Sequence, residues 1–517
     1  MNRKLICQIL NHEMMLATGC TEPAAIALTA AIAREQLDGE LEHIKVRASA
    51  NIIKNAMSAG IPGTNYTGIN YAAALGAVCG AVDRQLRVVD DARPEDIERA
   101  AHLVENGYVD VRRAFDPDKL YVEVELVNKE HQSRAIIKGA HTNVILVERD
   151  HQRVGCELPG QTMETDITPE QISRTLNIRT IYEFVETMDR RQDDLHMIQE
   201  AIEVNGHIAQ LGAAGDYGLN IGHGIRNNQE AGLMGHDVVM DAVAMTASGV
   251  DARMAGANAP VITNSGSGNQ GITATVPILS AAKSLGIDEE RTFRAVTLSN
   301  LMAIHIHADF GPLSGLCGAT IAAAAAACGL VYLQGGTLEQ IGFAVNNMFG
   351  NVSGMLCDGA KADCALKIST CVFAAFQCAA MALRSESVKA TDGIVETDPE
   401  ETIRNFVRLG NEGSSKCDDL IWRCFFRNRR TVMNYKELAE QALDYIVEQR
   451  RWCHQNPELS LEEVQTTEHI AAELQKMGYT EIQRFPDHTG LCAMLRGERP
   501  KRRAELWLSG RILMPCR

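Results

Sequence analysis

The sequence predicts an α+β protein: an N-terminal part with a small sheet, a mostly helical part, and a short α/β fragment at the C-terminal end. Hydrophobic residues make up 45% of the 517 residues but aromatic residues only 5%, a composition that favours close-packed helices over an aromatic-rich β-sandwich. Three short segments between 121 and 148 have strand character. From residue 168 onwards, apolar residues recur at helical spacing.

The N-terminal α+β domain is predicted over residues 1–165, with a sheet that we expect to be antiparallel. Two helical patterns between 3 and 37 flank the segment 19–23, in which Thr21 suits an N-cap and Pro23 the first helical turn. Strands are predicted over 43–48, 121–127, 134–138 and 143–148, with a turn over 60–64 and a helix over 71–82.

Cys20 falls at the start of the second predicted helix. The positive end of a helix favours a thiolate, which makes this cysteine a candidate for chemistry. The alternative is a small buried residue at a turn, and position alone does not separate the two.

The helical domain is predicted over residues 166–413. It contains Gly- and Asn-rich breaks between segments of helical spacing. These segments are 168–187, 193–213, 230–248, 276–285, 289–307, 318–330, 337–348 and 364–383.

One break in this domain, residues 264–271, is rich in glycine and polar side chains. Its glycines let backbone N–H groups approach a ligand, and such a nest suits a carboxylate or phosphate. It is not a P-loop, because no Gly-Lys-Ser/Thr follows. An ordinary loop is the alternative. The candidate binding residues are Asn264, Ser265, Gly266, Ser267, Gly268, Asn269 and Gln270.

Four cysteines repeat every seven residues from Cys357, through Cys364 and Cys371, to Cys378. On one continuous helix, neighbours in this series lie about 10.5 Å apart along the axis, too far to hold one compact cluster. If Asp358-Gly359 breaks the helix, Cys357 can fold back towards Cys364. The first pair is therefore a ligand candidate, and the second pair is assigned to the core.

Three further residues, one cysteine and two histidines, are candidates for binding a ligand or a metal. Cys317 precedes Gly318 at a predicted helix start, where its sulfur can face a ligand. His305 and His307 are typical metal ligands, but no third residue completes a zinc spacing, so core histidines are the favoured interpretation.

Composition excludes several classes of protein. The net charge of −16 without a long basic stripe argues against nucleic acid as a partner. The longest apolar run, near 321–333, is shorter than the roughly 20 residues of a membrane span, and the first residues do not resemble a signal peptide. Fifteen cysteines without a secretion signal indicate reduced thiols in the cytoplasm.

Taken together, these motifs resemble the bacterial L-serine dehydratase α-subunit-like superfamily, and most closely its branch of L-cysteine desulfidases, over about residues 1–413. The resemblance rests on the segments 19–23, 139–143, 264–271, 357–364 and 410–413, and on Cys317.

This resemblance implies an oxygen-sensitive [4Fe–4S] lyase that needs no pyridoxal phosphate. The implied cluster ligands are Cys317, Cys357 and Cys364, which leave one iron open as a Lewis acid. The implied reaction is α,β-elimination from L-cysteine to pyruvate, ammonia and sulfide, with Cys20 as the base. The loop 264–270 would hold the substrate carboxylate. The other residues implied to line the pocket are Thr21, Glu22, Lys138, His141 and Asn143.

Two alternatives stay open. Serine, or another β-substituted amino acid, can be the substrate. The resemblance favours cysteine, because Cys20-Thr21-Glu22-Pro23 stands where the corresponding loop of the serine dehydratases uses Ser and His. A protein of another class, a cluster-bearing, redox-responsive binding protein without turnover, is the second. The expected partners are a small amino acid and, where the chain self-associates, copies of itself, with no nucleic acid and no membrane.

The C-terminal part does not continue the resemblance. Residues 414–432 are interpreted as a linker, and 433–508 resemble the start of an M20-type peptidase or amidohydrolase, carried by the segment 450–460. We expect 433–517 to be a truncated fragment without a two-metal site or hydrolase activity, joined by a frameshift between neighbouring reading frames.

Overall fold

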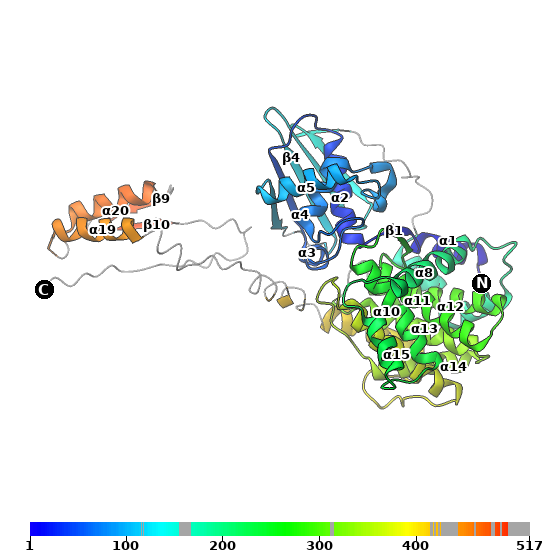
Figure 1. The fold of residues 1–517 in the computed structure, drawn as a ribbon. Coiled ribbons are helices and arrows are strands. Elements are labelled where there is room, and N and C mark those ends of the chain that lie inside the picture. The colour runs from blue at the N-terminus through cyan, green and yellow to red at the C-terminus, as the bar shows by residue number, and fades with distance from the viewer. Residues whose placement is uncertain are drawn as a thin grey trace. The chain divides into compact units, whose positions relative to one another are not determined.

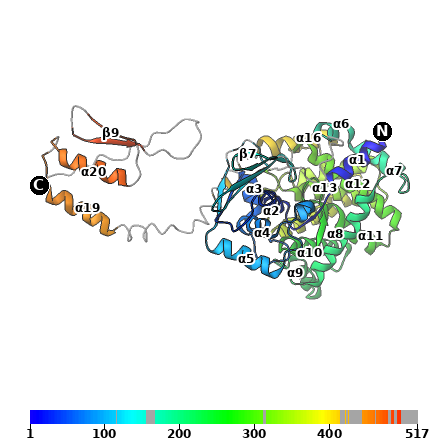
Figure 2. The same cartoon turned by 90° about the horizontal axis from the view of Figure 1, so that it is seen from above.

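The computed structural model describes most of the chain in two compact units, Met1–Cys424 and Phe425–Arg517. The described residues are 1–154 without 115 and 117, then 167–310, 315–413, 417, 420, 421 and 424, and 443–494 with gaps at 460–461, 477–480 and 486–488. Figures 1 and 2 show the chain from two directions. The α+β class is confirmed: most elements are helices, and the first unit carries a six-stranded sheet.

The six-stranded sheet has the order β3-β2-β4-β5-β6-β7. Its strands are β2 (His43–Ala48), β3 (Val109–Arg113), β4 (Tyr121–Val127), β5 (Gln132–Lys138), β6 (Val144–Arg149) and β7 (Gln152–Arg153). The expectation of an antiparallel sheet is wrong at one edge, where β2 and β3 pair in parallel. The physical reason is the connection: the chain between these strands crosses over through α3 (Ala50–Ala56), α4 (Ile69–Cys79) and α5 (Pro94–Glu105) instead of turning in a hairpin.

Helix α2 (Thr21–Arg34) is buried from Thr21 to Ala33. It packs against strands β4 and β5 on one side and against α4 on the other. Helices α2 and α4 can approach closely because Gly76 has no Cβ atom. A Cβ atom there would overlap the carbonyl oxygen of Ala27. The helix that begins after Cys20 is therefore held firmly at its position in the core.

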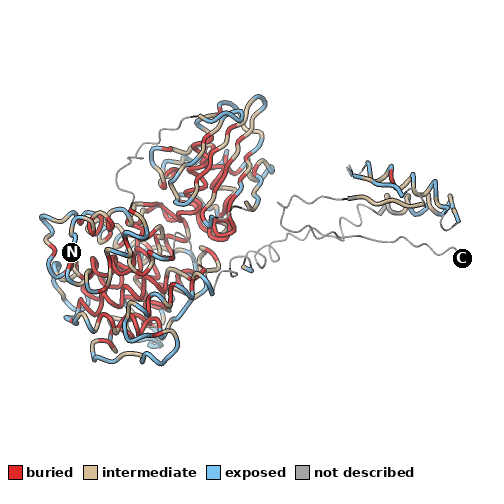
Figure 3. Tube along the Cα trace, turned by 180° about the vertical axis from the view of Figure 1, so that it is seen from behind, coloured by how far each residue is buried: buried red, intermediate tan, exposed pale blue. Residues whose placement is uncertain are grey.

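The rest of the first unit is a bundle of helices around α13, which is buried from Ala319 to Leu333 (Figure 3). Helices α11, α12, α14 and α15 pack around α13. The bundle helices are α6 (Pro169–Thr175), α7 (Ile178–Thr187), α8 (His196–Ala214), α9 (Ile221–Glu230), α10 (Val238–Met254), α11 (Gly268–Leu285), α12 (Glu289–His307), α13 (Gly318–Leu333), α14 (Leu338–Asn351), α15 (Cys364–Leu383) and α16 (Pro399–Arg408).

The start of the chain also belongs to this bundle. Helix α1 (Arg3–Glu13) packs against α6, α8 and α12. Strand β1 (Leu16–Thr18) pairs antiparallel with β8 (Pro260–Ile262), so it lies beside the strand that leads into the predicted binding loop. This pairing brings residues 19–23 and 264–271 to the same region.

The predicted helical segments match the structure well where apolar residues are regularly spaced. Helices α12 and α15 have the predicted bounds. The single segment predicted over 168–187 is two helices, because Asn177 interrupts it and its side chain caps α7 by accepting from the Thr180 N–H. Helices α3, α5, α9 and α16 were not predicted.

Helix α15 is, by length and composition, apolar enough to cross a membrane. This is weak evidence, because the core helices of globular proteins share these properties. In the structure, α15 packs against α10, α13 and α14, and its buried residues face those helices.

In the second unit the described residues form two helices and an antiparallel pair of strands. These are α19 (Leu443–Gln455), α20 (Val464–Lys476), β9 (Glu481–Arg484) and β10 (Leu491–Met494). Trp452 and His469 stack between the helices, with ring centroids 3.7 Å apart. The interpretation of this part as M20-like stays a prediction.

Candidate active site

Three helix N-termini meet in the first unit around the predicted binding loop. Cys20 is the N-cap of α2, Ser267 of α11 and Cys317 of α13. The Thr21 hydroxyl donates to the Gly266 carbonyl at 3.0 Å, which joins α2 to the loop. A Cβ atom on Gly318 would lie 2.9 Å from Gln270 Oε1, which places α11 beside the start of α13. Since each N-terminus carries a partial positive charge, this arrangement favours an anionic ligand.

Cys20 and Glu22 form a buried pair at the start of α2, with side chains only 5% and 7% exposed. The Cys20 thiol donates to Glu22 Oε2 at 3.0 Å, and Asn55 Nδ2 donates to Glu22 Oε1 at 2.8 Å. Burial, followed by the Glu22 carboxylate, raises the pKa of Cys20 well above its usual range. Although burial opposes ionisation of Glu22, the nearby His141 and the hydrogen bonds from Cys20 and Asn55 lower its pKa.

These pKa directions correct one expectation. The helix N-terminus does not by itself hold Cys20 as a thiolate, because desolvation and the adjacent carboxylate outweigh it. The pair instead consists of a neutral thiol and a carboxylate, and together they carry one negative charge.

His141 lies at the tip of the β5–β6 hairpin and faces the loop. A Cβ atom on Gly266 would lie 3.5 Å from its Cε1 and 3.6 Å from its Nδ1. Its Nε2 is buried without a hydrogen-bond partner among the described residues. Burial lowers the pKa of His141 although Glu22 acts in the opposite direction, so the ring is neutral at neutral pH.

The structure does not bring Lys138 and Asn143 into this cluster, although they flank the same hairpin. Lys138 Nζ pairs with Asp116 at 3.1 Å and with Asp118 at 3.0 Å. Asn143 is exposed and donates to the Lys138 carbonyl at 2.8 Å. The Asn143 side chain stabilises the hairpin, and the Lys138 side chain joins it to the segment before β4.

The loop 264–267 is a tight turn fixed by its own side chains. Ser265 and Gly266 both have positive φ, 47° and 79°. The Asn264 side chain donates to Asn300 and accepts from Gln270 Nε2 at 3.1 Å. Ser267 then caps α11 by accepting from the Gln270 N–H at 3.3 Å. The loop is thus positioned by the bundle.

The three cysteines of the implied ligand set come together from separate segments. The Cys317 N–H donates to the Met355 carbonyl at 2.6 Å and the Cys357 N–H to the Gly315 carbonyl at 3.1 Å, so the two segments run side by side. The Cys317 thiol donates to the Cys357 sulfur, and this contact lowers the pKa of Cys357 to about 6. Cys364 lies near enough to interact electrostatically with both.

The predicted break between Cys357 and Cys364 is present. Gly359 has a φ of +111°, and α15 begins only at Cys364. Cys371 and Cys378 continue down the helix, where Cys371 contacts Thr320 and Cys378 contacts Asn351. They are core residues, as predicted.

Two residues of α3 that the sequence analysis missed connect the two parts of the site. Asn55 donates to Glu22, and its Oδ1 lies 4.0 Å from the Cys357 sulfur. Lys54 is 5% exposed. Its positive charge and that of Lys367 both lower the pKa of Cys357. No sequence signal identified them, because their role depends on a contact 302 residues away in the chain.

The residues present fit an iron–sulfur cluster. Three neighbouring thiols, that of Cys364 buried and those of Cys317 and Cys357 partly buried, supply the usual donors, and Lys54 and Lys367 supply positive charge for an anionic cluster. Among the described residues, no three Cys, His, Asp or Glu side chains are placed to hold a single metal ion. An iron–sulfur cluster needs a different geometry, because each thiolate binds a different iron atom and the sulfurs therefore lie farther apart than around a single ion.

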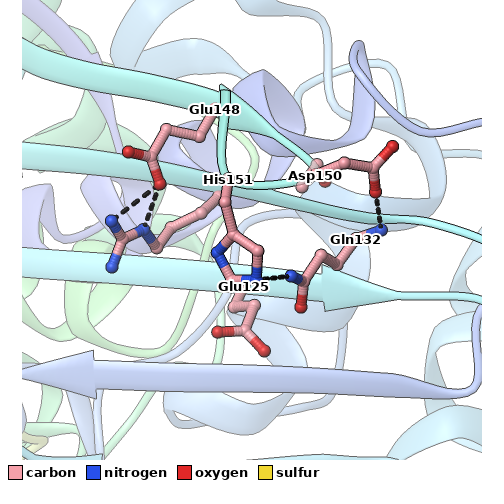
Figure 4. A pocket seen from close by; sticks show the side chains of 7 residues that line it. Glu125, Gln132, Glu148, Asp150 and His151 are labelled. Atoms are coloured by element: carbon pink, nitrogen blue, oxygen red, sulfur yellow. Dashed lines mark hydrogen bonds and ion pairs between the residues drawn. The ribbon is translucent and has the colours of Figure 1, made fainter. Parts of the chain in front are cut away.

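A small pocket on the sheet lies apart from these residues (Figure 4). It encloses about 30 Å³, room for about one water molecule. Its polar groups are paired with each other: Arg134 contacts Glu148 at 2.7 Å, and the Gln132 N–H donates to Asp150 at 3.0 Å. We assign no ligand to it.

Comparison with known proteins agrees with this geometry. The sequence model described as "Serine dehydratase alpha chain" matches residues 83–422, which include the loop and all three clustered cysteines. The chain belongs to this family. Membership of the serine dehydratase alpha chain family indicates a lyase-type enzyme of the β-elimination class.

Curated relatives match over a longer part of the chain. A UPF0597 protein of Oleidesulfovibrio alaskensis is 42% identical over 413 residues, 80% of this chain and 95% of the relative. A UPF0597 protein of Porphyromonas gingivalis is 40% identical over 419 residues, 80% and 96%. One of Clostridium perfringens is 38% identical over 429 residues, 83% and 99%. The family match ends at residue 422, close to the end of the first unit.

Proposed function

We propose that this member of the serine dehydratase alpha chain family is a PLP-independent, iron–sulfur-dependent L-cysteine desulfidase that releases pyruvate, ammonia and sulfide. The observation that carries the proposal is the buried contact of 3.0 Å between the Cys20 thiol and Glu22. It lies at the meeting point of three helix N-termini and is linked through Asn55 to the clustered cysteines.

Cys317, Cys357 and Cys364 would hold a [4Fe–4S] cluster. When bound, the cluster supplies a Lewis-acidic iron that favours departure of the substrate's β-substituent. The family is in general iron–sulfur-dependent, which supports this assignment.

The Cys20–Glu22 pair would remove the α-proton. The pair holds one proton and one negative charge, so it can accept one further proton near neutral pH. In the step, the Cys20 proton moves to Glu22 while the sulfur takes the proton from the α-carbon. The electron pair of the broken C–H bond forms the Cα–Cβ double bond as the β-thiol leaves. The aminoacrylate then hydrolyses to pyruvate and ammonia.

The surroundings support this use of the pair. Glu22 is held by Asn55, whose Nδ2 donates to Oε1 at 2.8 Å, so its carboxylate keeps a fixed direction towards Cys20. His141 is neutral and keeps a buried Nε2 available to the substrate. An iron–sulfur cluster and reduced thiols would suit a reducing cytoplasm, which we propose as the location.

Anaerobic reconstitution of the full chain with iron and sulfide tests the proposal. Sulfide and pyruvate formed in equal amounts from L-cysteine, with little pyruvate from L-serine, are the expected result. Pyruvate from L-serine without sulfide release from L-cysteine would assign the serine dehydratase reaction instead. A loaded cluster without turnover of either substrate would favour the redox-responsive binding protein.

A further inference from the structure

Arg253, near the end of α10, is a buried cation that the proposed chemistry does not use. Its side chain is 3% exposed. Nη1 donates to Asn269 Oδ1 at 2.8 Å, whereas Nε is buried without a hydrogen-bond partner. Within the described part of the chain, no carboxylate lies at ion-pair distance from this guanidinium. A buried charge is costly unless it is paired, so this guanidinium favours an anionic ligand.

The guanidinium lies against the first turn of α11. A Cβ atom on Gly268 would overlap Arg253 Nε and would lie 2.6 Å from Cζ, so only glycine permits this approach. The charge of Arg253 also acts on the Cys20 sulfur, whose pKa it lowers against the larger effect of burial. Arg253 is therefore close to both the α11 N-terminus and the proposed base.

Gln270, in the same turn, offers the complementary group. Its side chain is 2% exposed, and Nε2 donates to Asn264, which fixes the direction of the amide. Its Oε1 is a buried acceptor without a partner among the described residues and faces Gly318, beside Cys317. An unpaired buried acceptor also favours a ligand that can donate to it.

We infer that Arg253 and Gln270 recognise the two charged groups of an α-amino acid: the Arg253 guanidinium and the N-terminus of α11 bind the carboxylate, and Gln270 Oε1 accepts from the ammonium. This inference rests on the proposed function and names the residues that recognise the substrate's two charged groups. It predicts selection against hydroxy acids, which lack the ammonium group, and against amines, which lack the carboxylate.

Direct binding of L-alanine tests recognition by Arg253 and Gln270, since L-alanine has both charged groups but no leaving group at Cβ. Isothermal titration calorimetry with the full, cluster-loaded chain should show binding of L-alanine and weaker binding of L-lactate and ethylamine. We expect Arg253→Lys to weaken L-alanine binding about tenfold or more, because lysine lacks the two-pronged donor geometry. Gln270→Leu should remove the preference for L-alanine over L-lactate.

The controls separate a recognition role from a structural one. Arg291 is half-buried and donates to the Tyr332 and Leu333 carbonyls, so Arg291→Lys serves as a matched variant that should bind L-alanine like the parent chain. Thermal unfolding shows whether each variant is folded. Unchanged L-alanine binding by folded Arg253→Lys and Arg253→Met would overturn the inference while leaving the desulfidase proposal standing. Arg253-dependent L-alanine binding by a chain that turns over neither cysteine nor serine would overturn the desulfidase proposal and leave this inference standing.

Discussion

At the scale of single residues, Cys20 and Glu22 shift each other's pKa in opposite directions: Glu22 raises the pKa of Cys20, and Cys20 lowers that of Glu22. Burial and the neighbouring carboxylate keep the thiol protonated, whereas at neutral pH, where His141 is neutral, the hydrogen bonds from Cys20 and Asn55 favour the ionised carboxylate. The thiol alone would be a poor base at neutral pH. In the proposed mechanism Glu22 accepts the thiol proton, so the two side chains would act as one base.

Replacing Glu22 with Gln should therefore change the pH dependence of turnover. The pair is anionic above the lowered pKa of Glu22, so the parent activity needs no ionisation of the Cys20 thiol. In Glu22→Gln, Cys20 must ionise alone, and burial still raises its pKa. We expect kcat/KM for L-cysteine to fall about 100-fold at pH 7 and to recover as the pH rises above 9.

The ratio of variant to parent kcat/KM across pH 6–10 measures this, because titration of the substrate cancels. Glu35, at the exposed end of the same helix, provides the control, and Glu35→Gln should keep the parent profile. A Glu22→Gln profile parallel to that of the parent would show that Cys20 does not depend on this carboxylate.

The cysteine series offers a second residue-scale prediction. Serine at Cys317, Cys357 or Cys364 should lower bound iron from about four per chain to less than one, since each supplies a thiolate. Serine at Cys371 or Cys378, on the same helix as Cys364, should keep the iron. Iron and sulfide analysis after anaerobic reconstitution makes the comparison, and iron loss in the second group would contradict the ligand assignment.

At the scale of elements, the site depends on where helices begin. Cys20, Ser267 and Cys317 each stand at the N-cap of a helix, and Cys364 is the first residue of α15. Loops and strand pairs decide these starting points. The pairing of β1 with β8 joins the segments before Cys20 and Asn264, and the turn at Gly359 separates Cys357 from α15.

Gly359→Ala should disrupt this arrangement. Gly359 has a φ of +111°, and a Cβ atom there would overlap the Lys54 carbonyl oxygen. Since the obstacle is backbone, the turn must move and carry Cys357 with it. We expect a destabilisation of about 3 kcal/mol, seen as a lower melting temperature, together with loss of bound iron.

Gly107→Ala is the matched control, because Gly107 also has a positive φ, 75°, but open space where its Cβ would be. It should cost about 1 kcal/mol through backbone strain alone and keep the iron. Equal iron content in the two variants would show that the Gly359 turn does not position Cys357.

Sequence patterns predicted much of this scaffold. Regular apolar spacing gave the bounds of α12 and α15, and Asp358-Gly359 gave the break before Cys364. Helix α16 was missed because its short amphipathic stretch lies among charged residues, and the parallel β2–β3 pair depends on a crossover that spacing does not reveal. Asn55, Lys54 and Arg253 become candidate site residues only through tertiary contacts.

At the scale of the whole molecule, the candidate site lies entirely within the unit Met1–Cys424. The relatives match this chain over 95–99% of their own length while leaving about a fifth of it outside the match. A chain ending after Cys424 should thus keep iron content and cysteine turnover within about twofold of the parent. Both are measured after reconstitution, and loss of iron on removing Phe425–Arg517 would show that the second unit supports the site.

The most direct measurement of the central claim compares iron content with sulfide and pyruvate release for three anaerobic preparations: the parent chain, Cys20→Ala and Cys317→Ser. We predict about four irons with turnover of L-cysteine for the parent, the same iron without turnover for Cys20→Ala, and neither for Cys317→Ser. Turnover that survives in Cys20→Ala, or in iron-free Cys317→Ser, would contradict a cluster-dependent elimination with Cys20 as the base.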